Sequence, residues 1–459
     1  MQKVISVDRL RECERGSCIS LEELINRAGN AVVEELTSCF PRSSVLVLCG
    51  PGNNGKDGAV VARVLRGKGW PVRVLGYRSD IPGVAKLQFA DFVVSESIIV
   101  DAVFGFGLSR VLDADLQSVV RVINQSRRFV ISVDVPSGVN SDTSEVMGAA
   151  IKSDLTVTFS CLKFCHVVSP GRQYCGIVRV KDIGIEVGQA DVSVNSPSLW
   201  KKLIPKPHYG SHKYNRGYAV VYSLGIRSVG AVKLAALAAL RTCPGAVAVA
   251  CDTSEISLYA GVLSSVMYKL HDEVVCDYKV TAVLIGPGGE SSDLSICEMV
   301  CSVLDRCFKG YVLDAGAISV FEHQRERLFA RIRGKPVVLT PHKGEFGRIF
   351  PDIKGDIVQV AREAARVSGV TIVLKGHETI VASPDGRIVI NNNASSNLAT
   401  IGSGDVLAGM ITGLVAAGMD CFHAACCGVW IHGECASKYG LGMIAEDIVG
   451  RIPEVFSCL

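Results

Sequence analysis

The chain repeatedly places a short, largely apolar run directly before a turn or a helix-like segment. The first run, VLVL at 45–48, ends in Cys-Gly-Pro-Gly, and similar runs lie at 72–75, 98–100 and 129–133. Runs that are apolar on both faces are typical of buried parallel strands, which need helical crossovers between them. The pattern therefore predicts an α/β fold with a parallel sheet.

The length of the chain predicts two such domains. At 459 residues it exceeds what one ordinary hydrophobic core serves, so two domains of roughly 200 to 250 residues are expected. The alternation breaks between 185 and 213, which is rich in Gly, Ser, Asn and Pro and is the best linker candidate. Strand-like runs then resume at 219–222, 246–250, 282–285, 311–313, 337–339 and 371–374. We place the domains at 1–195 and 196–459.

Charge and cysteine usage narrow the class of partner. Lys plus Arg (48) nearly balances Asp plus Glu (45), and no basic stripe occurs, so we expect a small-molecule partner and no nucleic acid. The 18 cysteines include no CxxC pair, which argues against a zinc framework. The charged N-terminus lacks the apolar core of a signal peptide, and the apolar stretch 406–419 is too short to span a bilayer. We expect a soluble, cytoplasmic protein with free thiols and no membrane partner.

Three strand-end loops in the first half carry oxygen-rich side chains. Residues 50–58, GPGNNGKDG, form a Gly-rich turn that opens a helix, and such a turn offers backbone N–H groups to an anion. Asp101 and Asp134 follow two further strands, with Ser137 close behind. Amide, carbonyl and carboxylate oxygens suit a hard cation. Each Asp taken separately is more often a cap or turn former, so the prediction is that the loops share one pocket.

Together these motifs resemble the NAD(P)H-hydrate epimerase domain. The resemblance rests on 50–58, Asp101 with GFGLSR at 105–110, VDVPSG at 133–138 and LINRAG at 24–29. It implies substrate contacts from Asn53, Asn54, Gly55, Lys56, Asp57, Gly105, Phe106, Gly107, Leu108, Ser109, Arg110 and Val111. It also implies a substrate contact or proton transfer by Asp134, and a potassium ion held by Asn54, Asp101 and Ser137. The family usually has Gly where Lys56 stands, so this lysine would either add a phosphate contact or obstruct the approach.

The best-defined chemistry lies in TIGSGDVLAGM at 400–410. Its glycines expose the first N–H groups of a helix, and the helix dipole favours a phosphate there. The same positive end is expected to keep Asp405 ionised. An ionised carboxylate beside a phosphate can accept the proton of the attacking hydroxyl. The turn therefore predicts phosphoryl transfer with Asp405 as the base, the alternative being an ordinary helix start with glycines for packing.

Further strand-end loops complete a second resemblance. In order they are GAVKLAAL at 230–237, IGPGG at 285–289, LTPHKGE at 339–345 and LKGHET at 374–379. With Gly402 to Asp405 they are similar to the NAD(P)H-hydrate dehydratase domain of the ribokinase-like group, over essentially all of 205–455. The resemblance implies a hydrate site of Ala231, Gly288, His342 and Asp405, and an AMP or ADP site of Lys375, Gly376, His377, Glu378, Thr379 and Gly404. The family usually has Pro at Lys343, Gly at Ile401 and a second acidic residue at Gly316.

The two resemblances imply a bifunctional enzyme, isomerase and lyase, with two three-layer α/β domains, Rossmann-like at the N-terminus and ribokinase-like at the C-terminus. It would repair hydrated NADH and NADPH by interconverting the R and S hydrates and dehydrating the S form. Dehydration would phosphorylate the C6 hydroxyl and release phosphate with AMP or ADP. The implied cofactors are K⁺, Mg²⁺ and a phosphoryl donor, ADP or ATP, the fusion resembling the ADP-using type. Oligomeric state, homo-oligomers included, and the preference for NADH or NADPH stay open.

Two alternatives share these motifs. A ribokinase-like kinase of a small alcohol would use the turn at Gly402 without an epimerase partner and would release an intact phosphorylated product. Alternatively, the N-terminal domain is a binding module without catalysis, a reading motivated by Lys56.

Overall fold

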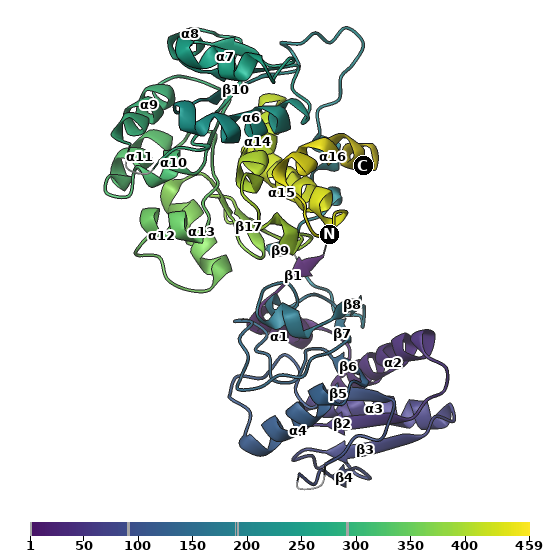
Figure 1. Ribbon diagram of the computed structural model, residues 1–459. Helices are drawn as coiled ribbons and strands as arrows, with labels where there is room; N and C mark the ends of the chain where they lie inside the picture. The colour runs from purple at the N-terminus through teal and green to yellow at the C-terminus, as the bar shows by residue number, and fades with distance from the viewer. Residues whose placement is uncertain (1, 90–91, 189, 191, 291–292) are drawn as a thin grey trace. The chain divides into compact units, whose positions relative to one another are not determined.

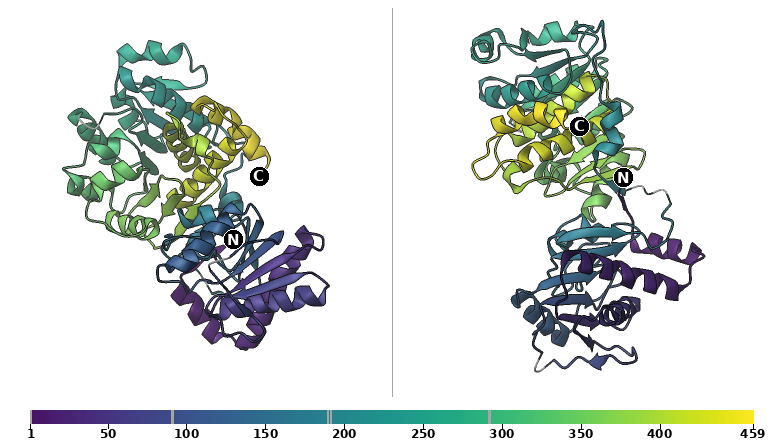
Figure 2. Two further views of the ribbon diagram at one scale, coloured as in Figure 1. Left: turned by 60° about the horizontal axis from the view of Figure 1, so that its bottom comes forward. Right: turned by 90° about the vertical axis from the view of Figure 1, so that its right-hand side faces the viewer.

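The protein is described by a computed structural model that covers residues 2–89, 92–188, 190, 192–290 and 293–459. The chain divides into two compact units, Gln2–Val192 and Ser193–Leu459. Each unit is an α/β domain in which helices cover both faces of a central sheet, as the views of Figure 1 and Figure 2 show for each unit by itself. The fold class predicted from the apolar runs is confirmed.

The N-terminal unit is a doubly wound parallel sheet. Its strands follow the order β4-β3-β2-β5-β6-β7-β8, and every pair in it is parallel. Its elements are β1 (Lys3–Val4), α1 (Val7–Gly16), α2 (Leu21–Cys39), β2 (Val45–Cys49), α3 (Asn53–Gly67), β3 (Val72–Gly76), β4 (Ala85–Lys86), β5 (Ile98–Ala102), α4 (Ala114–Gln125), β6 (Phe129–Val133), β7 (Leu155–Phe159) and β8 (Ile177–Lys181). The strand order reverses between β2 and β5, so the loops after these two strands flank a crevice at one edge.

Alternate residues of β2 serve two different cores. Val45 and Val47 join the core beneath α2 and α3, whereas Leu46 and Leu48 join the core beneath α4. Successive side chains of a strand point to opposite faces, so a strand covered on both sides must be apolar at every position. This is why the uninterrupted run VLVL marks a central strand.

The C-terminal unit also has a sheet with helices on both faces. This sheet is larger, and its strand order is β9-β18-β17-β16-β15-β14-β13-β10-β11-β12. Its strands are β9 (Val192–Val194), β10 (Tyr218–Tyr222), β11 (Ala246–Ala250), β12 (Met267–Lys269), β13 (Ala282–Ile285), β14 (Gly310–Leu313), β15 (Val337–Leu339), β16 (Thr371–Leu374), β17 (Thr379–Ala382) and β18 (Ile388–Asn391). The pairs from β12 to β16 are parallel, while β16, β17 and β18 pair antiparallel. The parallel strands place their carboxyl ends along one edge.

Helices cover this sheet on both faces. They are α5 (Pro197–Trp200), α6 (Val229–Leu240), α7 (Ile256–Ala260), α8 (His271–Val275), α9 (Leu294–Leu304), α10 (Gly316–Ser319), α11 (Arg325–Ile332), α12 (Lys343–Ile349), α13 (Ile357–Ser368), α14 (Ser403–Ala416), α15 (Cys421–Ser437) and α16 (Ala445–Ser457). Helices α6 and α14 pack closely because small residues face each other: a Cβ added at Gly409 would lie 2.2 Å from the Ala235 carbonyl oxygen. This contact fixes the position of α14, whose first turn carries the predicted phosphate site.

Two predictions need correction. The stretch 185–213 is not a uniform linker, since it contains β9 and α5, although its residues 189 and 191 lie outside the described residues. Asp101, expected after its strand, lies inside β5. Within the described residues, none of the helices combines the length and apolarity needed to cross a bilayer.

Candidate active sites at the carboxyl edges of the two sheets

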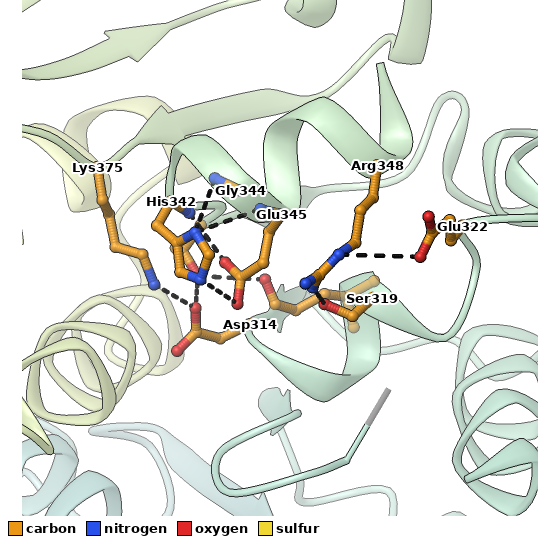
Figure 3. A network of polar contacts seen from close by, with 10 residues as sticks. Asp314, Ser319, Glu322, His342, Gly344, Glu345, Arg348 and Lys375 are labelled. Carbon is orange, nitrogen blue, oxygen red and sulfur yellow. Dashed lines mark hydrogen bonds and ion pairs between the residues drawn. The ribbon is translucent and has the colours of Figure 1, made fainter. Parts of the chain in front are cut away.

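Three adjacent parallel strands of the C-terminal unit end in polar side chains. Asp314 follows β14, His342 follows β15 and Lys375 follows β16, and these strands are neighbours in the sheet. The backbone N–H of Lys375 also donates to the Pro341 carbonyl oxygen at 2.9 Å, which extends the pairing beyond the strand ends. The side chains therefore meet at one edge, as Figure 3 shows.

An ion pair between the half-buried Lys375 and the buried Asp314 forms the centre of this site. Lys375 Nζ lies 2.7 Å from Asp314 Oδ1, and the Thr340 hydroxyl donates to the same carboxylate oxygen at 2.7 Å. Burial alone would lower the pKa of Lys375, but the charges of Asp314 and Glu345 outweigh it and raise the pKa. Lys375 is therefore a fixed ammonium group at the strand edge.

His342 and Glu345 form the cap of α12. His342 Nδ1 accepts hydrogen bonds from the backbone N–H groups of Gly344 and Glu345 at 2.9 and 3.2 Å, and the Glu345 carboxylate accepts from the His342 N–H at 2.9 Å. The second ring nitrogen, Nε2, lies 3.4 Å from Glu345 Oε1. The ring is thus oriented by the helix start, and its side chain is 56% exposed, which leaves it accessible to a ligand.

The first turn of α14 faces this ion pair. Gly402 adopts the left-handed conformation (φ 85°), and a Cβ added at Gly404 would lie 3.4 Å from Lys375 Nζ. The free backbone N–H groups of the turn and the ammonium group of Lys375 are therefore presented together. A phosphate placed here would meet both.

The prediction that Asp405 stays ionised is wrong, because its surroundings raise the pKa of the carboxyl instead of lowering it. Its pKa is raised to about 7, chiefly by burial and then by the negative charge of Asp314, while the Lys375 ammonium partly opposes the rise. The favourable helix dipole is thus outweighed by desolvation and by neighbouring carboxylates. A carboxyl that titrates near neutral pH is better matched to proton transfer than an ordinary aspartate.

The remaining predicted residues of this half divide into two groups. Ala231 and Gly288 are brought together, since a Cβ added at Gly288 would lie 3.2 Å from the Ala231 Cβ. After Lys375, the residues Gly376 and His377 are exposed, while Glu378 and Thr379 are buried as β17 begins. The most exposed part of this loop is therefore Gly376 and His377.

The three departures from the family pattern differ in their surroundings. Ile401 is 95% exposed beside the turn, and Lys343 is exposed in the first turn of α12. A Cβ added at Gly316 would meet the backbone of Gly289 at 2.7 Å, so glycine lets the loop after β13 approach α10 closely. None of these positions interrupts the ion pair.

In the N-terminal unit, Asp134 is the centre of a buried network. Its Oδ1 accepts from Lys163 Nζ at 2.7 Å and from the Thr158 hydroxyl at 3.0 Å, while Oδ2 accepts from the Phe106 N–H at 2.9 Å. His166 Nε2 lies 3.0 Å from the Asp134 carbonyl oxygen. Burial alone would raise the pKa of Asp134, but the Lys163 ammonium outweighs it and lowers the pKa. Asp134 is therefore an ionised carboxylate despite its burial.

The loops after β2, β5 and β6 converge as expected. A Cβ added at Gly105 would lie 3.0 Å from Asp134 Oδ2 and 3.2 Å from Asn54 Oδ1. Gly50 approaches β5 so closely that a Cβ there would lie 1.8 Å from the Val103 carbonyl oxygen. The glycines thus allow the contact between loops that a nucleotide site at this crevice requires.

Asp101 lies beneath these loops and is inaccessible to water. Its carboxylate accepts from the Ser132 hydroxyl and the Ser137 N–H at 2.8 Å, and from the Ser137 hydroxyl at 2.5 Å. Burial raises its pKa, and these hydrogen bonds oppose the rise. Among the described residues Asp101 has no ion-pair partner, while Asn54 is half-buried and its side-chain nitrogen, Nδ2, is buried without a hydrogen-bond partner. The oxygen atoms of Asp101, Ser137 and the Asn54 amide are of the kind that a hard cation takes.

The other predicted epimerase residues lie in two segments, the start of α3 and the loop after β5. Asn53 and Lys56 are exposed at the start of α3, whereas Asp57 is buried. Burial raises the pKa of Asp57 well above its ordinary value, and the charges of Asp134 and Glu14 add to the rise.

Gly55 is buried beneath the turn, and Gly107 lies near the Arg11 side chain. Leu108 is buried, whereas Ser109, Arg110 and Val111 are exposed, away from Asp134 along the same loop.

Sequence reasoning missed Lys163, Asp314 and Glu345 as members of the two sites. Lys163 is the one charged side chain between Leu155 and Cys165, and a lone charge in an apolar stretch was the signal that could have marked it. Asp314 ends an apolar strand as Asp134 does. Glu345 caps α12, and its charge also raises the pKa of Asp405.

Comparison with solved structures identifies the class of the C-terminal fold. A crystal structure of ADP/ATP-dependent NAD(P)H-hydrate dehydratase from Bacillus subtilis, co-crystallized with ATP/Mg²⁺, matches with a TM-score of 0.50 and 27% identity, covering 58% of this chain and 98% of that chain. A ribokinase-like superfamily protein from Enterococcus faecalis has the same fold, with a TM-score of 0.52 and 23% identity over 60% of this chain and 98% of that chain. The C-terminal unit thus has a ribokinase-like α/β fold.

Sequence comparison covers both units. Residues 225–453 match the family NAD(P)H-hydrate dehydratase, and residues 21–96 and 84–165 match the family YjeF-related protein N-terminus. The bifunctional NAD(P)H-hydrate repair enzyme of Moorella thermoacetica is 34% identical, covering 94% of this chain and 92% of the relative. The corresponding enzyme of Dictyoglomus turgidum is 31% identical over 89% of this chain and 88% of the relative. The chain belongs to the family of bifunctional NAD(P)H-hydrate repair enzymes, which confirms the resemblance found in its sequence.

Proposed function

We propose that this chain repairs hydrated NADH and NADPH at two active sites, an epimerase in 1–195 and a dehydratase in 196–459. The observation that carries the proposal is the group of Asp405, Lys375 and Asp314 beside the first turn of α14. A phosphate at this turn would meet N–H groups and an ammonium group, and a hydroxyl beside it would meet a carboxyl that titrates near neutral pH. Family membership supports the substrate class.

In the dehydratase, Asp405 takes the proton of the C6 hydroxyl of the S hydrate. The hydroxyl oxygen bonds to the terminal phosphorus of the nucleotide, and the bond from that phosphorus to the rest of the nucleotide breaks. The lone pair of the ring nitrogen then expels phosphate as the C6–O bond breaks. Loss of the neighbouring C5 proton restores the double bond, so the products are NAD(P)H, phosphate and AMP or ADP.

The binding residues follow the two groups described above. Ala231, Gly288, His342 and Asp405 hold the hydrate, and Lys375, Gly376, His377, Glu378, Thr379 and Gly404 hold the adenine nucleotide. The approach of Ala231 to Gly288, and of Gly404 to Lys375, supports this division.

Mg²⁺ belongs to the proposal as an ion that comes with the nucleotide. No group of three or more His, Cys, Asp or Glu side chains suited to a metal occurs in the part of the chain that the structure describes. Such a cage is not needed, because Mg²⁺ is usually held by phosphates, waters and one or two carboxylates. When bound it would neutralise the charge of the phosphates. ADP and ATP both stay candidates for the donor.

In the epimerase, the carboxylate of Asp134 holds or moves a proton of the hydrated ring, and Lys163 fixes its charge and orientation. The Gly-rich turn and the loop from Gly105 to Val111 bind the nucleotide. Potassium would be held by Asn54, Asp101 and Ser137, whose oxygen atoms fit a hard cation and whose buried Asp101 lacks a cationic partner among the described residues. A cytoplasmic location and any homo-oligomer stay predictions.

The test is incubation of the full chain with racemic hydrated NADPH, Mg²⁺ and either ADP or ATP, following the absorbance of intact NADPH. Complete recovery with one donor is expected. No recovery with either donor would overturn the proposal. Accumulation of an intact phosphorylated product would favour the small-alcohol kinase, and consumption of the S epimer alone would favour an N-terminal domain without catalysis.

A further inference from the structure

A small pocket opens beside the predicted nucleotide loop of the N-terminal unit. Its volume is about 160 Å³, and its lining includes Tyr77, Arg78, Arg110, Val111 and Asp113. Tyr77 and Arg78 directly follow β3, whereas Arg110 and Val111 belong to the loop after β5. The pocket therefore joins the ends of two strands on either side of β2.

The strand order assigns this pocket a place along a bound dinucleotide. From β2 the chain proceeds to β3 on one side and then to β5 on the other, so the crevice lies outside the ends of β2 and β5. In such sheets the pyrophosphate sits at the Gly-rich turn after the first strand, and the adenosine ribose reaches the end of the next strand. The Tyr77 N–H donates to the Cys49 carbonyl oxygen at 2.8 Å, which fixes the end of β3 beside that turn. Asp134, after β6, lies on the opposite side, where the nicotinamide end would be.

The pocket carries two guanidinium groups and one carboxylate. Arg78 Nη2 lies 2.9 Å from Asp113 Oδ2, and its guanidinium lies over the Tyr77 ring at 5.4 Å from the centroid. Asp113 also accepts two other hydrogen bonds. One comes from the Tyr77 hydroxyl, and the other, from the Leu116 N–H at 2.9 Å, caps α4. The hydrogen bond from Tyr77, together with the charges of Arg78 and Arg110, lowers the pKa of Asp113. The carboxylate is therefore ionised and holds Arg78 in place.

Arg110 completes the positive charge of the pocket. Its side chain is exposed, and the structure gives it no ion pair or hydrogen bond to any other described residue. Arg78 uses one of its five donors on Asp113, which leaves the others for a ligand. The pocket thus has two guanidinium groups and one carboxylate, and that carboxylate is already paired with Arg78. This excess of positive charge suits a dianionic phosphate better than a neutral hydroxyl.

We infer that Arg78 and Arg110 bind the 2′-phosphate on the adenosine ribose of hydrated NADPH, so that the epimerase favours hydrated NADPH over hydrated NADH. The inference rests on the proposed epimerase function and assigns its substrate preference. An arginine near the end of the second strand is the means by which related dinucleotide folds accept this phosphate.

The first experiment measures epimerisation by the full chain without a phosphoryl donor, following the R and S forms by chromatography. The wild type should have a kcat/KM at least about tenfold higher for hydrated NADPH than for hydrated NADH. Arg78→Ala and Arg110→Ala should each lower this ratio by about 10- to 100-fold, the value of a lost charge-assisted hydrogen bond. Arg78→Lys keeps the charge but cannot make a bidentate contact, so its kcat/KM ratio should lie between those of the wild type and Arg78→Ala.

The control is Arg121→Ala, which removes one exposed charge from α4 without touching the pocket, and it should leave the ratio within about twofold. A wild-type preference for hydrated NADH, or a ratio that survives both arginine variants, would overturn the inference and leave the epimerase function standing.

The second experiment separates the inference from the proposed function. Calorimetric binding of adenosine 2′,5′-bisphosphate and of adenosine 5′-monophosphate is compared between the wild type and Arg78→Ala, so that binding at the nucleotide site of the dehydratase, which the variant leaves intact, cancels. We expect the wild type to bind the bisphosphate more tightly than the monophosphate. Arg78→Ala should reduce this difference in affinity by the same factor by which it reduces the ratio of the two kcat/KM values. If the wild type epimerises neither hydrate, the proposed epimerase fails, and this difference in binding still decides whether the arginines take a 2′-phosphate. If Arg78→Ala weakens neither ligand, or weakens both equally, that assignment is refuted.

Discussion

Lys163 Nζ lies 2.7 Å from Asp134 Oδ1, and the two side chains are only 1% and 5% exposed. In a buried pair, each charge depends on the other, because a single ion left without its partner bears the full cost of desolvation. Besides Asp134, Lys163 donates to the Thr158 hydroxyl at 2.7 Å and to the Phe159 carbonyl oxygen at 3.3 Å, so its buried ammonium group is held by protein atoms. Its Nζ also lies 5.9 Å from the centre of the Phe106 ring. It is therefore a positioning residue for the Asp134 carboxylate.

Replacing Lys163 with Met should raise the pKa of Asp134 and lower epimerisation by at least about 100-fold, the usual contribution of a proton-transfer group. The pH profile distinguishes this role from a merely structural one, because the acidic limb of epimerisation should move to higher pH. The variant should also lose about 3–5 kcal/mol of stability. Lys163→Arg should recover part of the rate, and an unshifted pH profile in Lys163→Met would refute the role.

The Asp405→Asn variant should lose dehydration by about 1,000-fold or more while epimerisation continues, because the amide cannot accept the hydroxyl proton. Recovery of NADPH absorbance and chromatography of the epimers measure the two activities. A matched control is Asp385→Asn, an exposed carboxylate of the same unit that pairs with Arg387 in the turn between β17 and β18. Full dehydration by Asp405→Asn would exclude its role as the base.

Dehydration should depend on the ionisation of Asp405. Its pKa is raised to about 7, so the carboxyl keeps its proton below that pH and cannot act as a base. The rate should therefore rise with pH through about 7. Because the charge of Glu345 contributes to the raised pKa, Glu345→Gln should move the midpoint to lower pH. A midpoint that stays in place, or moves upward, in this variant would contradict the electrostatic account.

The strands were predictable from the sequence where local pattern decides the structure. The runs at 45–48 and 246–250 are apolar at every position, and both form interior strands with a neighbour on each side. β7 was missed because its sequence, LTVTF, inserts threonines that are buried through hydrogen bonds to distant groups, such as Thr156 to the Cys175 carbonyl oxygen. Such partners cannot be inferred from local periodicity.

The candidate sites were predictable in their loops but not in their electrostatics. The helix start at Gly402 drew attention to Asp405 as a candidate base, yet the ionisation of Asp405 depends on Asp314 and Glu345, which are distant in sequence. Likewise the position of Asp134 after a strand was visible, whereas its cation, Lys163, comes from the segment after a strand that the pattern did not mark. Burial and charge at a site are properties of the assembled fold.

Replacing K⁺ by Li⁺ should lower epimerisation and leave dehydration unchanged. The proposed ion would balance the buried charge of Asp101, and the smaller ion would fit the same oxygen atoms poorly. Ser137→Ala should have the same effect in K⁺ and should reduce the difference between the two ions. Epimerisation that is equal in K⁺ and Li⁺ would argue against a potassium site.

The packing of α6 against α14 should control the stability of the C-terminal unit. In Gly409→Ala the added methyl group would lie 2.2 Å from the Ala235 carbonyl oxygen, so the helices must separate. We expect a loss of about 1–3 kcal/mol in the free energy of unfolding, measured with urea. Gly450→Ala is the matched control, because its position in α16 has no atom within 4 Å of the new methyl group. That variant should gain about 0.5–1 kcal/mol from helix propensity. Because the first turn of α14 carries Asp405, Gly409→Ala should also slow dehydration more than epimerisation, and equal losses in both activities would contradict this link between packing and site.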